Sequence, residues 1–215
     1  MKVDVKTHVL ENNRTQANML REKFQDILVV NMTGSPGAGK TTVLEQVIPD
    51  LHKEYSIAVI EGDVQTSRDA ERIADLGVEA VQINTMGGCH LDAKMVAGCI
   101  DDLGKLPDIL FIENIGNLVC PAEYDLGEDF KVTVLSVPEG EDKPLKYPGM
   151  FRNSKAVIIN KVDLLPHMDY DIEKVEDEIK GIQPHIEIFR IGKNTRESSA
   201  LLADWLAACL KKKRA

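Results

Sequence analysis

The chain has 215 residues, of which 43% are hydrophobic and 28% are charged, a balance that suits a folded α/β domain. Its formal net charge of −9 argues against nucleic acid and anionic membranes as partners. The first residues carry no apolar leader-like stretch and no run approaches the length of a membrane span, so we expect a cytoplasmic protein with reduced cysteines.

Short apolar runs alternate with helical patterns along the chain. Residues 8–25 are predicted to form an N-terminal helix, and further helices are predicted at 40–53, 67–76, 91–104, 171–180 and 197–212. Several apolar runs are continuous, as in strands that are buried on both faces. The pattern predicts an α/β fold with a doubly wound, mostly parallel sheet of about seven strands and helices on both faces. The predicted strands are Ile27–Met32, Ile57–Glu61, Ala80–Ile83, Ile109–Glu113, Val132–Val137, Ala156–Asn160 and Ile186–Ile191.

A phosphate-binding motif lies between the first predicted strand and the helix that follows it. Residues 34–41 read Gly-Ser-Pro-Gly-Ala-Gly-Lys-Thr and match G-x-x-x-x-G-K-S/T in the context that this motif requires. Lys40 is expected to reach the β- and γ-phosphates, and the Thr41 hydroxyl is expected to bind Mg²⁺. We therefore expect residues 1–215 to form one P-loop domain. The residues expected around the phosphates are Gly34, Gly37, Ala38, Gly39, Lys40, Thr41 and Thr42.

A base-recognition motif, Asn160-Lys161-Val162-Asp163, follows another apolar run and matches N-K-x-D. The Asp163 carboxylate can accept hydrogen bonds from guanine N1–H and the N2 amine, whereas adenine would leave it unpaired. Asn160 and Lys161 are expected to brace the loop and cover the base. The motif thus predicts a GTPase and argues against a P-loop kinase that acts on a small molecule.

Acidic residues stand where strands are expected to end. We expect Asp63 to position the attacking water, and Asp69 or Glu113 to support Mg²⁺. Pairing with a helix dipole explains Asp69 equally well. Residues 113–116, Glu-Asn-Ile-Gly, resemble D-x-x-G, so the Gly116 N–H is expected to contact the γ-phosphate. Asn117 follows in place of a water-orienting Gln, which predicts slow intrinsic hydrolysis.

Thiol and imidazole side chains form a second candidate site. Cys89 and His90 come shortly after one predicted strand, and Cys120 comes shortly after another. Thiolate and imidazole ligands suit Zn²⁺, copper and Ni²⁺, and three ligands suit an exchangeable or shared metal better than a closed structural site. From the residues alone, an alternative stays open in which two cysteines belong to the core and the histidine lies on the surface.

These motifs together resemble the HypB family of hydrogenase maturation factors, which are GTPases that help deliver nickel to nickel–iron hydrogenase. The resemblance implies a signal-recognition-like P-loop fold and a homodimer promoted by GTP. It implies that Cys89, His90 and Cys120 bind Ni²⁺ or Zn²⁺, and that Lys146 reaches the partner's nucleotide. It also implies a nickel-binding maturation protein and the hydrogenase large subunit as partners. The matching segments are residues 34–42, 62–66, 86–90, 113–121, 142–148 and 161–163.

Two departures from the family pattern stand out, in addition to one difference from a related family. The N-terminus has neither a Cys-rich nickel motif nor a His-rich stretch, and His8 is its only candidate ligand. Residues 190–194 replace the usual S-A-K, although Lys193 is still expected to lie over the base. The related urease accessory GTPases typically have Pro between the metal-binding Cys and His, whereas Cys89 and His90 are adjacent here.

We expect a carrier whose metal affinity depends on the bound nucleotide, because GTP and Mg²⁺ would order the loops that carry Asp63 and Gly116. Two alternatives stay open. One is a metal-buffering protein with vestigial GTPase activity, and the other is a nickel GTPase of the urease accessory type.

Overall fold

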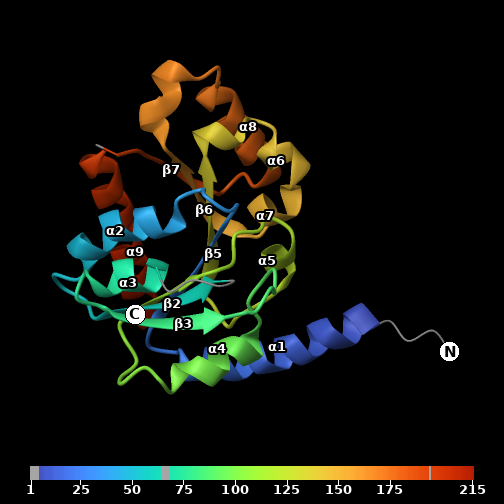
Figure 1. Ribbon diagram of the computed structural model, residues 1–215, viewed down its shortest axis with the longest axis vertical. Coiled ribbons are helices and arrows are strands. Elements are labelled where there is room, and N and C mark those ends of the chain that lie inside the picture. Colours follow the sequence, from blue (N-terminus) through green and yellow to red (C-terminus); the bar gives the residue numbers. More distant parts are fainter. Residues whose placement is uncertain (1–4, 64–67, 194) are drawn as a thin grey trace.

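One sheet of parallel strands organises the computed structural model, which describes residues 5–63, 68–193 and 195–215. Its seven strands are ordered β3-β2-β4-β1-β5-β6-β7, and each neighbouring pair is parallel (Figure 1). The predicted α/β architecture is therefore confirmed, with a fully parallel sheet. The strands are β1 (Leu28–Gly34), β2 (Ile57–Asp63), β3 (Glu79–Asn84), β4 (Ile109–Glu113), β5 (Phe130–Ser136), β6 (Ser154–Asn160) and β7 (Glu187–Ile191).

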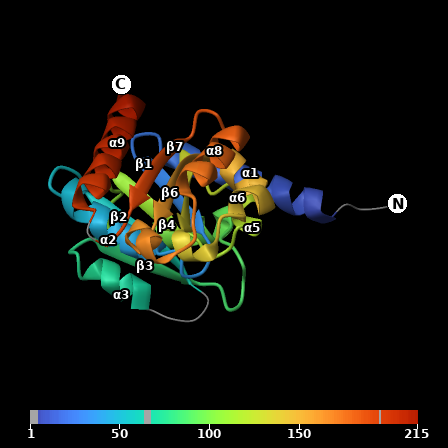
Figure 2. The same ribbon diagram turned by 90° about the horizontal axis from the view of Figure 1, so that it is seen from above.

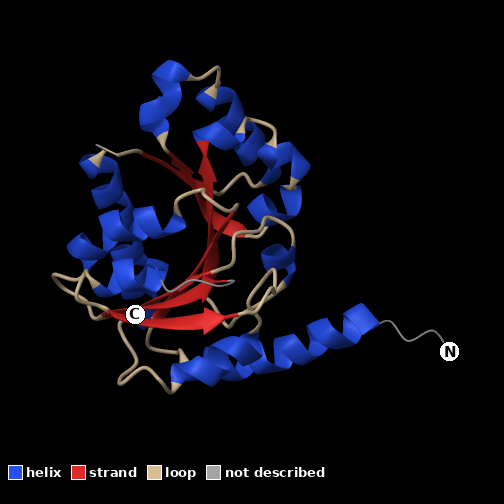
Figure 3. Ribbon diagram, viewed as in Figure 1, coloured by secondary structure: helices blue, strands red, loops and turns tan. Residues whose placement is uncertain are grey.

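Helices cover both faces of the sheet, because a parallel strand can return only through a crossover connection (Figure 3). Among the described residues, no helix is both long enough and apolar enough to cross a membrane. The helices are α1 (Val5–Lys23), α2 (Lys40–Leu51), α3 (Arg68–Ala74), α4 (Ala93–Ile100), α5 (Cys120–Glu123), α6 (Lys143–Lys146), α7 (Pro148–Arg152), α8 (Ile172–Ile182) and α9 (Arg196–Arg214), with 3₁₀ turns at Val137–Glu139 and Val162–His167.

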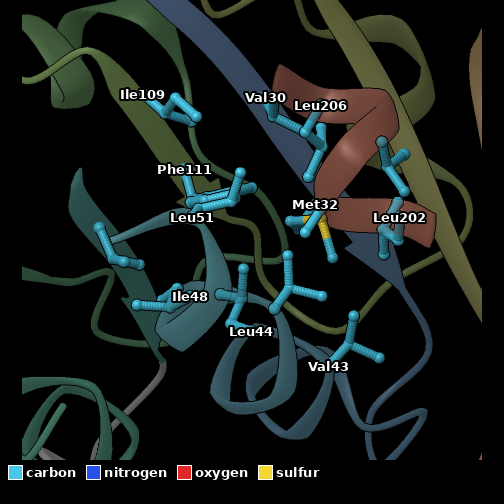
Figure 4. Close-up of a cluster of buried hydrophobic side chains, with 14 of the residues drawn as sticks. Val30, Met32, Val43, Leu44, Ile48, Leu51, Ile109, Phe111, Leu202 and Leu206 are labelled. Atoms are coloured by element: carbon cyan, nitrogen blue, oxygen red, sulfur yellow. The ribbon is translucent and has the colours of Figure 1, made fainter. Parts of the chain in front are cut away.

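The two faces of the sheet bury separate apolar clusters, because successive strand side chains point to opposite faces. Val30 and Phe111 pack with α2, α3 and α9, and Leu44 and Leu206 come from two of those helices (Figure 4). On the other face, α1 and α4 cover β2, β4 and β1, while α7 and α8 cover β5 and β6. Figure 2 shows α2, α3 and α9 on one side of the sheet and α1 and α8 on the other.

Most predicted helices are present with shifted ends. The helix expected at 91–104 is limited to α4, because the Asp92 side chain caps its start by accepting the Met95 N–H at 2.8 Å. The helix expected at 67–76 is α3, and residue 67 lies outside the described ranges. The helix expected at 8–25 begins earlier and ends at Lys23. The short helices α5, α6 and α7 were not predicted, because each is too short to show a helical period.

The basic end of α9 lies at the amino ends of the strands, opposite their carboxyl ends. Lys213 Nζ donates to Phe24 O at 2.9 Å and pairs with Asp129 at 2.7 Å. Arg214 donates to Asp26 O at 2.8 Å and to Asp108 Oδ1 at 2.7 Å. The last turn of the chain therefore ties the segments that enter β1, β4 and β5.

Replacing Asp108 tests this tie through the pH dependence of folding. Two hydrogen bonds from Ser56 and the nearby Arg214 lower the pKa of Asp108 to about 2, the Ser56 hydroxyl contributing most. A lowered pKa in the folded state stabilises the fold above the unfolded pKa, and this stabilisation is lost as pH falls toward about 2. We expect Asp108→Asn to lower the free energy of unfolding by about 1 kcal/mol near neutral pH.

Urea denaturation at neutral pH and at about pH 3 measures this effect, since the deficit should shrink as the wild-type carboxylate becomes protonated. Asp101→Asn is the control, because that side chain is 83% exposed and pairs with Lys23 at the surface. A deficit that does not depend on pH would show that the Asp108 charge is not the source of the stability.

Candidate functional site

The phosphate loop connects β1 to α2 at the carboxyl end of the sheet. Gly39 stands at the start of α2 with φ 92°, a left-handed conformation that favours glycine. A Cβ on Gly39 would also collide with Asn160 Nδ2. The loop faces a cavity of about 470 Å³ that Lys40, Thr41 and Thr42 help to line. A helix N-terminus and a glycine-rich loop meet at this cavity, which is an arrangement suited to phosphate.

Two buried carboxyl groups form the floor of the same cavity. Glu61 on β2 and Glu113 on β4 are paired in register and are only 2% and 5% exposed. Thr41 Oγ1 donates to Glu113 Oε1 at 2.9 Å, and Lys40 Nζ lies 4.0 Å from that oxygen. Burial, followed by the charge of Glu113, raises the pKa of Glu61 to about 10, so Glu61 is the protonated partner. Burial also raises the pKa of Glu113, and Lys40 opposes that shift.

Glu61 is a site residue to which sequence reasoning assigned no role. Its Oε1 atom and Glu113 Oε2 are buried without a hydrogen-bond partner among the described residues. Such oxygens are costly unless a donor or a cation reaches them. The signal in the sequence was a carboxylate within an otherwise apolar strand, and the first five residues of β2, Glu61 included, are buried.

The other predicted acids also line this cavity. Asp63 ends β2 and Asp69 lies in the first turn of α3, and both face the cavity. Asp69 Oδ1 accepts a hydrogen bond from Arg72 at 2.8 Å, and Arg72 also pairs with Glu45 at 2.7 Å. The segment between these acids, 64–67, lies outside the described residues. Asp69 is therefore held by an arginine at the cavity rim.

Gly116 approaches the phosphate loop closely from the end of β4. A Cβ on Gly116 would lie 2.7 Å from Pro36 Cα, so no larger residue fits there without a shift of the backbone. The next residue, Asn117, donates its backbone N–H to Gly34 O at 2.8 Å. The loop that leaves β4 is therefore packed directly on the phosphate loop.

The base-recognition motif is joined to the phosphate loop. Asn160, at the end of β6, is buried and donates its amide Nδ2 to Ala38 O at 2.9 Å. Lys161 has a φ of 61° and donates its Nζ to Gly37 O at 2.6 Å. Asp163 Oδ1 accepts the backbone N–H of Lys193 at 2.9 Å. The structure thus brings the motif to the phosphate loop and places Lys193 beside Asp163 through its backbone.

Lys146 lies away from the cavity lining. Its side chain is 58% exposed and its Nζ is 3.4 Å from Asp142. It belongs to the short helix α6, on whose surface Leu145 is also exposed. Within this chain, Lys146 therefore makes a surface ion pair.

The structure brings Cys89, His90 and Cys120 together. Their ligand atoms all lie within 4.8 Å of one another, with Cys89 Sγ at 3.2 Å from Cys120 Sγ and 3.5 Å from His90 Nδ1. Burial lowers the pKa of His90, which favours the neutral imidazole that binds metals. Two soft thiols and an imidazole form a donor set for Zn²⁺ or Ni²⁺. The alternative of two core cysteines is wrong for this pair, since Cys89 is exposed and Cys120 half-buried.

Tyr124 is a neighbour of this cluster that sequence reasoning missed. Its ring stacks on His90 with centroids 3.8 Å apart, and it follows α5, which begins at Cys120. The other two cysteines lie elsewhere: Cys99 is buried, and burial raises its pKa to about 11, while Cys209 is half-buried against the core. Cys89 and Cys120 thus belong to the cluster, whereas Cys99 and Cys209 pack with apolar side chains.

Comparison with known proteins identifies the family. Residues 28–190 match the model of the CobW/HypB/UreG nucleotide-binding domain. The chain is 47% identical to the hydrogenase maturation factor HypB of Escherichia coli (strain K12) over 211 residues, which is 95% of this chain and 71% of that protein.

Solved structures agree with this match. The crystal structure of HypB from Helicobacter pylori in complex with nickel is 40% identical, with a TM-score of 0.86 over 94% of this chain and 95% of that chain. The signal recognition particle receptor FtsY from Elizabethkingia anophelis is 14% identical, with a TM-score of 0.56 over 95% of this chain and 81% of that chain, and it shares the fold alone. The chain belongs to the HypB family of hydrogenase maturation GTPases.

Proposed function

We propose that this chain is a GTP-hydrolysing metallochaperone in which nucleotide state controls a bound Ni²⁺ or Zn²⁺ ion. One observation carries the proposal: a single loop begins at Glu113 in the nucleotide cavity and ends at Cys120 in the cysteine–histidine cluster. Only a few residues separate the two sites along the chain. A nickel complex of a solved HypB that is 40% identical to this chain supports the choice of metal.

The nucleotide side of the mechanism follows from the residues around the cavity. Lys40, Thr41, Thr42 and the backbone of the phosphate loop would hold the phosphates, and Lys40 would neutralise charge that develops during transfer. Asp63 would orient the attacking water. Asp163 would read the guanine edge, with Asn160, Lys161 and Lys193 fixing its loop. The Gly116 N–H would meet the γ-phosphate where this glycine packs on Pro36.

The residues near the phosphates suit Mg²⁺, which prefers oxygen ligands. Thr41 and Glu113 would hold the ion, with Asp69 as a further carboxylate at the rim. The buried Oε2 of Glu113, which has no hydrogen-bond partner among the described residues, supports this fit. When bound, the ion would supply positive charge that neutralises the phosphates.

The metal side suits transient binding of a cargo ion. Among the described residues the cluster has three ligands and lies near the surface, so a fourth ligand would come from solvent, a donor protein or a second copy of the chain. We propose that GTP promotes a homodimer, with Lys146 reaching the partner's nucleotide. We also propose that a nickel-binding maturation protein and the hydrogenase large subunit exchange the metal with this chain in the cytoplasm.

Loss of the γ-phosphate would relax the loop at Gly116, and the change would pass along residues 113–120 to the cluster. The test measures Ni²⁺ and Zn²⁺ binding by calorimetry with GDP and with a non-hydrolysable GTP analogue, with dimer mass followed by light scattering. We expect metal affinity to differ by about 5-fold or more between the two nucleotides, together with the dimer fraction. Identical metal binding in both states would leave a GTPase with an independent, buffering metal site.

Replacing Asp163 tests the base-recognition role. Asp163→Asn removes an acceptor for the guanine edge, so two charged hydrogen bonds worth about 1.5 kcal/mol each are lost and GTP affinity should fall about 100-fold or more. The Asn amide can instead donate to the C2 carbonyl of xanthine, so binding of xanthosine triphosphate should improve. Fluorescent-nucleotide titration measures both.

Asp169→Asn is the matched control, since Asp169 is an exposed acid close to the same turn. Unchanged GTP affinity in Asp163→Asn would remove this residue from base recognition.

Replacing Cys89 tests the metal assignment. Loss of one of the three ligands in Cys89→Ala should weaken Ni²⁺ binding more than about 100-fold, since even indirect neighbours of metal ligands contribute 10–100-fold. Thiolate-to-nickel absorption and metal content after gel filtration provide the readouts. Cys209→Ala is the control, because this half-buried cysteine lies outside the cluster. Full metal content in Cys89→Ala would overturn the site.

A further inference from the structure

Asn117 touches the nucleotide site through its backbone. Its N–H donates to Gly34 O at 2.8 Å, and the two residues form an isolated antiparallel bridge. Gly34 is the last residue of β1 and the first residue of the phosphate loop. This hydrogen bond therefore links Asn117 directly to the start of the phosphate loop.

The side chain of Asn117 points to the metal cluster. Its Nδ2 donates to Cys89 O at 3.1 Å, and its Oδ1 accepts the Val119 N–H at 2.8 Å, directly before Cys120. One half-buried side chain therefore contacts both segments that supply cysteine ligands, although these segments follow different strands.

The cysteine–histidine segment is held to the nucleotide side at a second point. The buried Asn114 Oδ1 accepts the Leu91 N–H at 3.2 Å, and Asn114 Nδ2 donates to Asn31 Oδ1 at 3.2 Å. Leu91 is fully buried, and a Cβ on Gly62 would lie 2.9 Å from its Cδ1 atom. Asn114 and Leu91 are thus held within the core, whereas Asn117 links the two cysteine segments near the surface.

We propose that Asn117 is the positioning residue that transmits nucleotide state to the metal cluster by setting the separation of Cys89 and Cys120. This inference rests on the proposed function, in which nucleotide controls metal affinity. The position follows Gly116, where a water-orienting Gln stands in other GTPases. Here the amide is hydrogen-bonded to Cys89 O and to the Val119 N–H, so it contacts the part of the loop that carries the metal ligands.

The variants Asn117→Ala and Asn117→Asp test the proposal. The first removes both side-chain hydrogen bonds, while the second keeps the acceptor for Val119 and loses the donor for Cys89 O. Both keep the backbone bond to Gly34 and all three metal ligands. The matched control is Asn153→Ala, since the exposed Asn153 donates to Ala122 O at 3.0 Å within the helix that Cys120 begins.

The readout is the ratio of Ni²⁺ affinities with the GTP analogue and with GDP, measured for each protein separately. If the wild-type ratio is about 5-fold or more, we expect it to fall to within about 2-fold of unity in both Asn117 variants and to persist in Asn153→Ala. The nucleotide-dependent change in the thiolate-to-nickel absorption band should disappear in parallel. Thermal unfolding confirms that each variant is folded, and the band at saturating nickel confirms that its ligands are intact.

Each outcome decides a different question. A wild-type ratio of one contradicts the proposed function, and this inference falls with it. A wild-type ratio far from one that both Asn117 variants retain leaves the proposed function standing and overturns the role of Asn117. Loss of the ratio in Asn153→Ala as well would also overturn it, because the effect would then come from general loosening of the segment around α5.

Discussion

The position of β4 between β2 and β1 is the constraint on which both sites depend. Parallel pairing sets Glu113 in register with Glu61 on one side and with Met32 on the other, so the loop that leaves β4 starts beside the phosphate loop. The same loop ends at Cys120 after only a few residues. A different strand order would place Glu113 away from Thr41 and would separate the nucleotide cavity from the cysteines.

Burying the two carboxyl groups is costly, and the site offsets this cost only in part. Thr41 and Lys40 contribute a hydrogen bond and a nearby positive charge to Glu113, while Glu61 is kept protonated by burial and by its neighbour. Glu61 Oε1 and Glu113 Oε2 remain buried without a hydrogen-bond partner among the described residues. These acceptor oxygens lie next to a phosphate-binding loop, in keeping with the magnesium ion that we propose there.

The metal cluster differs from the nucleotide site in its chemistry and in its exposure. Soft ligands gather near the surface, two of them on one segment after β3 and one at the start of α5. Neither segment belongs to the sheet, so the distance between them depends on side-chain hydrogen bonds, notably those of Asn117. Such bonds are individually weak, which suits the nucleotide-dependent change in geometry that we propose for this site. The buried Asn114, by contrast, is tied into the core and holds the base of the loop in place.

The sequence by itself determined the elements whose chemistry is local. The phosphate loop and the Asn160–Asp163 motif are contiguous, and their glycines, lysine and carboxylate identify them without any tertiary contact. Continuous apolar runs likewise identified the strands of a parallel sheet. Only the tertiary structure decided that Cys120 meets Cys89. The strands that precede these cysteines, β3 and β4, are separated by β2 in the sheet, and the order of strands in a sheet does not follow their order along the chain. The same reason hid the pairing of Glu61 with Glu113 and the direction of the Asn117 side chain, since each depends on contacts between residues far apart in the sequence.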